Sequence, residues 1–265
     1  MRYKLEQVSF GDPANQAIFL LPGWAMPKEC FYELAQKLSQ QYYVVLVNLP
    51  GISTDVELIK GAKTGPNYDI DALTEQLILA APKDAWWLGW SLGGMIASYV
   101  AAHRASCVKG LITIASNPSF VRSEDWQWGM SLGDFEAFED LIKYDPVVAL
   151  KRFIALQSKG SRAAAEVRKQ LSHWVEPDAC LPLALEAGLH LLKNLDVRRE
   201  LEILDMPSLH LLGEKDVLVD SNWPKAIINN CVPIEYKVFE NCAHQPFIED
   251  LDQLYPHIEN FLNAQ

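Results

Sequence analysis

Apolar runs alternate with helix-like segments along most of the chain. Seven of these runs have the length and composition of β-strands, at residues 3–10, 17–21, 42–49, 85–90, 109–115, 207–212 and 234–239. Several are apolar at consecutive positions, which is typical of strands buried on both faces of a parallel sheet. Helix-like segments separate the strands. The pattern therefore predicts an α/β fold with a mostly parallel sheet and helices on both faces.

Residues 118–195 break this alternation. They show helical patterns and no convincing strand, and the segment is too long for a plain loop in a compact domain. We therefore predict that residues 1–117 and 196–265 form an α/β core and that residues 118–195 form an inserted helical cap. Such a cap would lie over one edge of the sheet, where it would shape a pocket and restrict water.

Length and composition fit one enzyme-sized unit, since 265 residues with 49% hydrophobic content can bury a substantial core. No apolar run approaches the roughly 18 residues of a membrane span, and the N-terminus lacks the apolar region of a signal peptide. The five cysteines form no C-x-x-C pair, which is typical of free thiols in a reducing compartment. We expect a cytoplasmic protein that binds neither a membrane nor a metal ion.

A G-x-S-x-G motif follows the apolar run at residues 85–90, with Gly89 and Gly93 on either side of Ser91. A strand that turns abruptly into a helix strains its central residue, and only small neighbours let the two backbones pass so closely. The serine hydroxyl then stands at a helix N-terminus, where backbone N–H groups favour negative charge on a substrate oxygen. Ser91 is therefore the candidate nucleophile, although the motif alone also occurs by chance.

Two further residues lie where this kind of serine site has its acid and its base. Asp216 and His244 come just past the last two predicted strands, and the order serine, acid, histidine is that of the nucleophile-elbow class. A serine hydroxyl needs a general base, which predicts that role for His244, while Asp216 would fix the imidazole tautomer. Asp205 and Asp220 remain alternatives for the acid, and the other five histidines are interpreted as structural.

An oxyanion site requires two N–H donors, one from the residue after the nucleophile and one from a loop after an early strand. Leu92 occupies the first position and Trp24 fits the second. Together with the elbow and the order of the partners, this loop resembles the α/β-hydrolase superfamily over nearly the whole chain. That family usually has His-Gly in the loop, whereas here Pro22 precedes Gly23. Because backbone donors survive such a change, Trp24 N–H remains the second predicted donor.

Basic residues gather in the predicted cap although the whole chain has a net charge of −11. Residues 143–169 contain seven basic and two acidic side chains, so seven minus two gives a local charge of +5. Clustered charge beside a catalytic mouth favours capture of an acidic partner, because it focuses the local potential. Nucleic acid is the lesser interpretation, since the patch is short and the whole domain is acidic. The basic residues are Lys143, Lys151, Arg152, Lys159, Arg162, Arg168 and Lys169.

Several segments together resemble one family of serine carboxylesterases, the pimeloyl-acyl carrier protein methyl ester esterases of biotin synthesis. These segments are residues 23–24, 86–94, 113–118, 152–157 and 243–247, of which 152–157 in the cap is the most specific. The resemblance implies hydrolysis of the methyl ester of pimeloyl-acyl carrier protein, with release of methanol and without a metal or an organic cofactor. Acyl carrier proteins are strongly acidic, which agrees with the basic cap. We expect the esterase to be a monomer.

The same resemblance implies roles for individual residues. It assigns catalysis to Ser91, Asp216 and His244. It assigns the acyl pocket to Trp24, Leu92 and Phe153, and carrier docking to Arg152. Trp90 is a further candidate for the pocket wall. For Trp24, Trp90 and Phe153 an ordinary position in the core is the alternative, because aromatic side chains are more often core than substrate wall.

The other docking positions depart from the family pattern. Val148 and Ala165 stand where the family has arginine. Lys169 is a substitute for a basic residue of the family pattern, and Lys159 and Arg162 lie nearby. The positive charge of the docking surface is therefore retained while its individual contacts differ.

Two other functions share these residues. A broad carboxylesterase or thioesterase for short-chain esters would have the same catalytic trio and would be indifferent to a carrier protein. A small-molecule binder on a hydrolase scaffold would keep the fold without the reaction.

Overall fold

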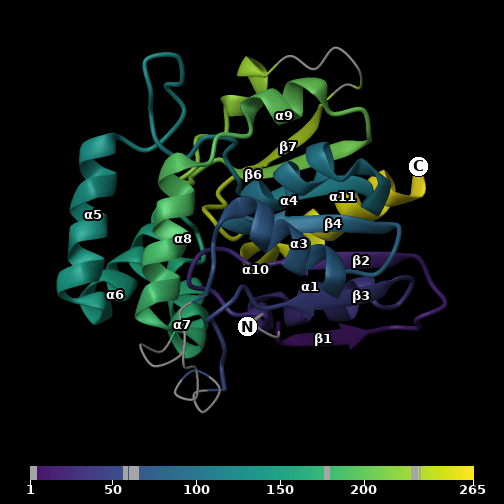
Figure 1. Ribbon diagram of the computed structural model, residues 1–265, viewed down its shortest axis with the longest axis horizontal. Helices are drawn as coiled ribbons and strands as arrows, with labels where there is room; N and C mark the ends of the chain where they lie inside the picture. Colours follow the sequence, from purple (N-terminus) through teal and green to yellow (C-terminus); the bar gives the residue numbers. More distant parts are fainter. Residues whose placement is uncertain (1–4, 56–58, 60–65, 176–179, 228–231, 233) are drawn as a thin grey trace.

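A seven-stranded sheet forms the centre of the protein in the computed structural model, which describes residues 5–55, 59, 66–175, 180–227, 232 and 234–265 (Figure 1). The strand order is β1-β3-β2-β4-β5-β6-β7, and every pair is parallel except β1 with β3. This confirms the predicted mostly parallel α/β fold. The strands are β1 (Gln7–Phe10), β2 (Ala17–Leu21), β3 (Tyr43–Val47), β4 (Ala85–Trp90), β5 (Val108–Ile114), β6 (Ser208–Gly213) and β7 (Glu235–Phe239).

The strand ends differ from the predicted ones mainly at the edge of the sheet. The prediction of a strand over residues 3–10 was too long, because Leu5 and Glu6 lie outside β1, and residues 3 and 4 lie outside the described part. β1 alternates between half-buried and exposed positions. An antiparallel edge strand can keep one face in solvent, whereas β2, which lies between two parallel neighbours, is buried at all five positions.

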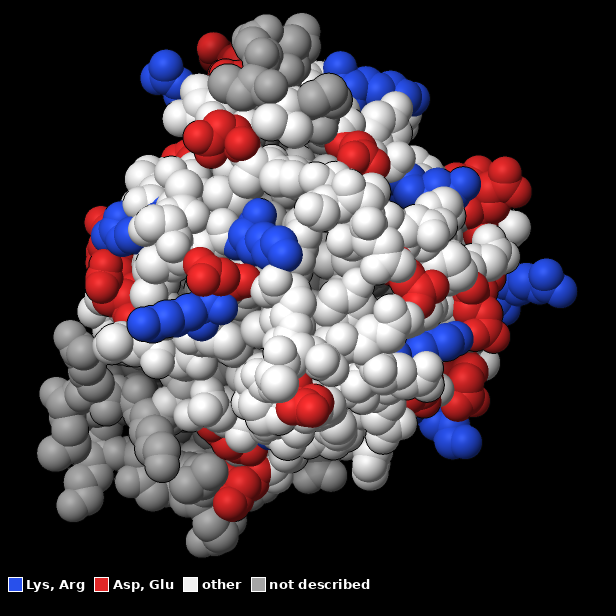
Figure 2. Space-filling model, turned by 90° about the vertical axis from the view of Figure 1, so that its right-hand side faces the viewer, with Lys and Arg blue, Asp and Glu red and all other residues white. Residues whose placement is uncertain are grey.

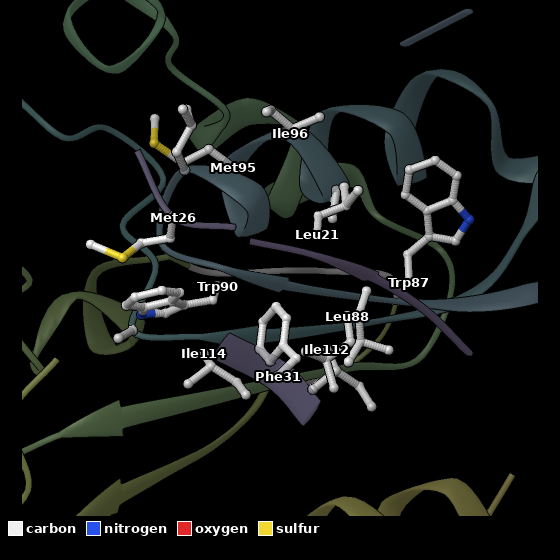
Figure 3. Close-up of a cluster of buried hydrophobic side chains, with 14 of the residues drawn as sticks. Leu21, Met26, Phe31, Trp87, Leu88, Trp90, Met95, Ile96, Ile112 and Ile114 are labelled. Atoms are coloured by element: carbon white, nitrogen blue, oxygen red, sulfur yellow. The ribbon is translucent and has the colours of Figure 1, made fainter. Parts of the chain in front are cut away.

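Helices cover both faces of the sheet, and the side chains of β4 show how. Successive side chains of a strand point to opposite faces. Trp86 packs edge-on against Phe261 of α11 (Leu251–Asn263). Figure 3 shows the Trp87 side chain of β4 on the same side of the strand as Ile96, which belongs to α4 (Leu92–His103). Phe31 lies on the other side. α4 also packs against α3 (Ile70–Ala80) and α9 (Arg198–Ile203), and α11 packs against α1 (Tyr32–Leu38).

Four helices lie together beside one end of the sheet (Figure 1). Local signals explain two of their starts: the Ser131 hydroxyl accepts the Asp134 N–H, and the Asp145 carboxylate accepts the Val148 N–H. They are α5 (Leu132–Tyr144), α6 (Pro146–Gln157), α7 (Ala164–Trp174) and α8 (Pro182–Asn194), all within the segment predicted to form the cap.

Short helices complete the described part. They are η1 (Lys28–Phe31), η2 (Ala105–Cys107), η4 (Trp223–Ala226) and α10 (Pro246–Glu249). Among the described residues, none of the helices combines the length and the apolar character that crossing a bilayer requires.

Candidate active site

Ser91 occupies a sharp turn between β4 and α4. Its backbone has φ 54° and ψ −118°, a left-handed conformation that few side chains adopt without strain. A Cβ on Gly89 would lie 2.3 Å from the carbonyl oxygen of Gly93, and one on Gly93 would lie 2.3 Å from that of Leu21. The two glycines are therefore required by close backbone approach. The Ser91 N–H donates to the Ile114 carbonyl at 2.9 Å, which fixes the turn onto β5.

Asp216 and His244 meet in a buried pair formed by the loops after β6 and β7. The Asp216 Oδ2 atom lies 2.7 Å from His244 Nδ1, and each side chain is only 1% exposed. The other carboxylate oxygen accepts the N–H groups of Leu218 and Val219, at 2.8 and 3.1 Å. His244 Nε2 is buried and has no hydrogen-bond partner among the described residues. With Nδ1 protonated toward the carboxylate, Nε2 presents a free lone pair.

The structure separates Asp216 from the two alternative acids. Asp205 is exposed, and the Asp220 carboxylate accepts the backbone N–H of Asn222 at 2.9 Å. No contact of either residue with His244 occurs in the described part of the chain. Of the three carboxylates that the sequence left open, Asp216 is the one that reaches the imidazole.

Trp90 brings the loop of His244 beside the serine turn. Its indole N–H donates to the His244 carbonyl at 2.9 Å, and the indole and imidazole centroids are 5.6 Å apart. Since Trp90 directly precedes Ser91, the loop after β7 lies next to the elbow. The indole also packs against Phe31 and Phe247, with ring centroids 6.4 and 5.2 Å away; Figure 3 shows the rings of Trp90 and Phe31.

The two predicted oxyanion donors lie at the same edge of the sheet. Leu92 is the first residue of α4, and neither its N–H nor that of Trp24 has an acceptor among the described residues. A Cβ on Gly23 would lie 3.3 Å from the Ser91 Cβ, so the loop after β2 runs alongside the serine. Both N–H groups therefore remain available for a substrate oxygen.

A cavity of about 710 Å³, lined by both apolar and polar side chains, lies between helices α5, α6 and α8 and the loops after β2 and β6, and its volume is within the range of small-molecule sites. Trp24 forms part of its wall and packs edge-on against Phe153 and Phe138, with centroids 4.9 and 5.5 Å away. The indole N–H donates to the Leu185 carbonyl in α8 at 2.9 Å, which ties the loop to the cap. Sequence reasoning missed several aromatic wall residues, namely Phe120, Trp128, Phe135 and Phe138.

Not all predicted pocket residues line this cavity. Trp24 and Phe153 do, and so does Asp216, whereas Trp90 and Leu92 do not. Trp90 lies in the core behind the elbow, where it supports the loop of His244.

The rim of the cavity carries both signs of charge. Of the predicted docking residues, Arg152 and Lys159 line it, whereas Arg162 and Lys169 are exposed elsewhere on the cap. Arg122 is a third basic lining residue that sequence reasoning missed, because it stands outside the basic run. Acidic lining residues accompany them, namely Asp134, Glu214, Asp216 and Asp220.

Among the residues that the structure describes, no group of three or more His, Cys, Asp or Glu side chains is arranged to hold an ion. Burial raises the pKa of the Cys242 thiol to about 12, so this neighbour of His244 stays protonated at neutral pH.

Comparison with known proteins identifies similar sequences and folds. Residues 18–255 match the model of the alpha/beta hydrolase family. The chain is 34% identical over 250 residues to the pimeloyl-acyl-carrier protein methyl ester esterase of Aeromonas salmonicida, covering 92% of this chain and 94% of that protein. It is 32% identical over 248 residues to the protein of the same name from Nitrosospira multiformis, covering 92% and 93%.

Solved structures agree on the fold. An esterase from Exiguobacterium antarcticum superposes with a TM-score of 0.81 at 21% identity, covering 98% of this chain and 94% of the other. A hydrolase from Oleispira antarctica superposes with a TM-score of 0.84 at 17% identity, covering 99% and 96%. At these identities the likeness concerns the architecture alone.

Proposed function

Because this chain belongs to the alpha/beta hydrolase family, and within it to the pimeloyl-acyl-carrier protein methyl ester esterases, we propose that it hydrolyses the methyl ester of pimeloyl-acyl carrier protein. The products are methanol and pimeloyl-acyl carrier protein, as expected for a step of biotin synthesis. The observation that carries the chemistry is the buried pair of Asp216 and His244, in which His244 Nε2 has no partner among the described residues. Trp90, which directly precedes Ser91, holds the loop of His244 through a hydrogen bond.

The reaction follows from the properties of these groups. Ser91 Oγ attacks the ester carbonyl while His244 Nε2 takes its proton, and the Asp216 carboxylate stabilises the imidazolium. The oxyanion accepts the N–H groups of Trp24 and Leu92. His244 then protonates the departing methanol. A water molecule deprotonated by the same imidazole cleaves the acyl-enzyme, which restores the serine and releases the free carboxylate.

The cavity suits a long acyl chain with a small leaving group. Its aromatic wall, with Trp24 and Phe153, offers an apolar surface to methylene groups, and each buried methylene contributes about 0.8 kcal/mol. Methanol requires little room beside the serine. Substrate preference therefore follows from the acyl side of the site.

A surface on the cap fits an acidic carrier protein. Lys151 and Arg152 are exposed on α6, and Lys159 is exposed two residues beyond its end. Tyr144 is 91% exposed at the start of this surface, and Val148 is 39% exposed. Since Arg152 and Lys159 also line the cavity, a partner docked here delivers its acyl chain directly to the mouth. Figure 2 shows the side of the molecule opposite the cap, where basic and acidic side chains are interspersed.

The decisive experiment is a mass-spectrometric assay of methanol loss from methyl-pimeloyl-acyl carrier protein, run beside a free short-chain ester. We expect demethylation of the carrier-linked ester by the wild type and none by Ser91→Ala. Turnover of the free ester alone would leave an esterase of broad specificity. No turnover, together with no labelling of Ser91 by a fluorophosphonate, would leave a binding protein.

The docking surface has a separate test. Charge reversal at Arg152 and Lys159 is expected to slow turnover of the carrier-linked ester and to spare a free ester, and added salt is expected to act in the same direction, because exposed charges are screened over about 10 Å at 0.1 M. Lys83→Glu, in the exposed turn before β4, is the matched control. Equal losses on both substrates would refute docking at these residues.

A further inference from the structure

The backbone around His244 is held by hydrogen bonds at three consecutive N–H groups. The Ala243 N–H donates to both carboxylate oxygens of Glu249 at 2.9 Å, and the Gln245 N–H donates to one of them at 3.2 Å. Between them, the His244 N–H donates to the backbone carbonyl of Gln157 at 3.1 Å. Gln157 is the last residue of the cap helix α6, whereas Glu249 belongs to α10 in the core.

Gln157 makes a second contact with this loop through its side chain. The side-chain amide of Gln245 donates through Nε2 to the side-chain oxygen of Gln157, and both residues are fully buried. The remaining amide atoms, Gln157 Nε2 and Gln245 Oε1, are buried without a partner among the described residues. The contact between the two side chains therefore joins the end of α6 to the loop of His244.

Glu249 is tied to the cap as well. Burial raises the pKa of Glu249, and the nearby hydroxyl of Ser161, in the connection between α6 and α7, lowers it. The Arg162 N–H also donates to the Asn241 carbonyl at 3.2 Å. The end of α6 and the connection after it thus contact the loop of His244 at several points, although they belong to the cap.

We infer that Gln157 and Glu249 are positioning residues for His244, so that the cap holds the catalytic base as well as the substrate. This inference rests on the proposed function of His244. Among the described residues the imidazole has one side-chain hydrogen bond, to Asp216, which leaves the distance from Nε2 to the serine to be set by the backbone. A displacement of about 1 Å in a reacting group lowers the rate by about 10²-fold.

The test uses the full-length protein and a soluble short-chain ester, so it does not depend on the carrier protein. Glu249→Ala and Gln157→Leu are each expected to lower kcat by up to about 10²-fold with KM unchanged. The reaction of Ser91 with a fluorophosphonate is expected to slow in parallel. Glu249→Gln keeps one acceptor oxygen for two N–H groups and is expected to fall between the wild type and Glu249→Ala.

Asp69→Ala is the control variant, because it also removes a carboxylate that accepts a backbone N–H. The Asp69 carboxylate accepts the Ala72 N–H at the start of α3 at 3.0 Å, outside the site. A spectroscopic readout separates positioning from general destabilisation: the low-field proton resonance of the His244 Nδ1–H bond to Asp216 is expected to shift or broaden in Glu249→Ala and Gln157→Leu and to stay unchanged in Asp69→Ala.

Each outcome has a distinct meaning. If both site variants keep the wild-type kcat and the same imidazole resonance, the positioning role is wrong. If kcat falls no further than in Asp69→Ala, the contacts only stabilise the fold and the inference is overturned. If the wild type itself fails to react with the fluorophosphonate, the proposed function fails instead.

Discussion

A buried histidine outside the site predicts how stability depends on pH. His210 lies on β6, and its Nδ1 atom is 2.7 Å from the hydroxyl of Thr113 on β5. Its Nε2 atom is buried without a partner among the described residues, and the Trp223 ring packs edge-on at 5.0 Å. A second proton on this ring would have no acceptor. Burial accordingly lowers the pKa of His210 from 6.5 to about 3.

The magnitude follows from proton linkage. Between about pH 6.5 and pH 3 the unfolded chain binds one proton at this residue that the folded protein does not, so stability falls by about 1.4 kcal/mol per pH unit as the pH is lowered. The contribution is complete above the unfolded pKa. At about pH 5 the loss from His210 alone is about 2 kcal/mol, a large part of the 5–15 kcal/mol typical of a folded domain.

The assay is urea unfolding of the wild type and His210→Asn at about pH 7.5 and pH 5. Asparagine places a polar atom near the position of Nδ1, which retains a partner for Thr113, and it does not titrate. We expect the wild type to lose about 2 kcal/mol more than the variant between the two pH values. The cavity left by the smaller side chain lowers stability at both pH values and cancels in this comparison. Identical losses in the two proteins would refute the assignment of a neutral, buried His210.

Three further predictions test the site. Asp216→Asn is expected to lower kcat by about 10⁴-fold, because the imidazole then adopts the wrong tautomer. The control Asp220→Asn should match the wild type in steady-state kinetics. Comparable losses in the two variants would contradict the choice of Asp216 as the acid. Phe153→Ala is expected to cost about 3 kcal/mol in urea unfolding and to raise KM for a long acyl ester more than for an acetyl ester, and an equal change for both esters would remove this ring from the acyl pocket. Gly188→Ala would place a Cβ 2.6 Å from Trp24 Cδ1. We expect this overpacking to lower the free energy of unfolding, measured in urea, by about 1–3 kcal/mol and to lower kcat. Wild-type values for both quantities would show that the indole moves freely.

Much of the core could be predicted because its signals are local. A strand buried on both faces is apolar at consecutive positions, and β2 and β4 begin and end where the apolar runs do. The elbow could also be predicted, since the backbone approach at Gly89 and Gly93 excludes any side chain. The edge strand β1 could not be delimited in the same way, because a strand with one solvated face carries a weaker pattern.

The relation between cap and core could not be read from the sequence. Periodicity predicts which face of a helix is buried and says nothing about the partner it is buried against. Trp24 reaches the carbonyl of a residue 161 positions away, and Gln157 pairs with a residue 88 positions away. The aromatic wall with Phe138 and the basic residue Arg122 were missed for the same reason.

The sequence by itself therefore determined the α/β core, the serine turn and the position of each candidate partner after a strand, since every one of these features is marked by residues close together in the chain. The tertiary structure alone decided which carboxylate meets His244 and which side chains line the cavity. It also placed the last residue of α6 against the backbone of His244. The crossovers between parallel strands and the packing of the cap bring these groups together, because the strands deliver their carboxyl ends to one edge of the sheet.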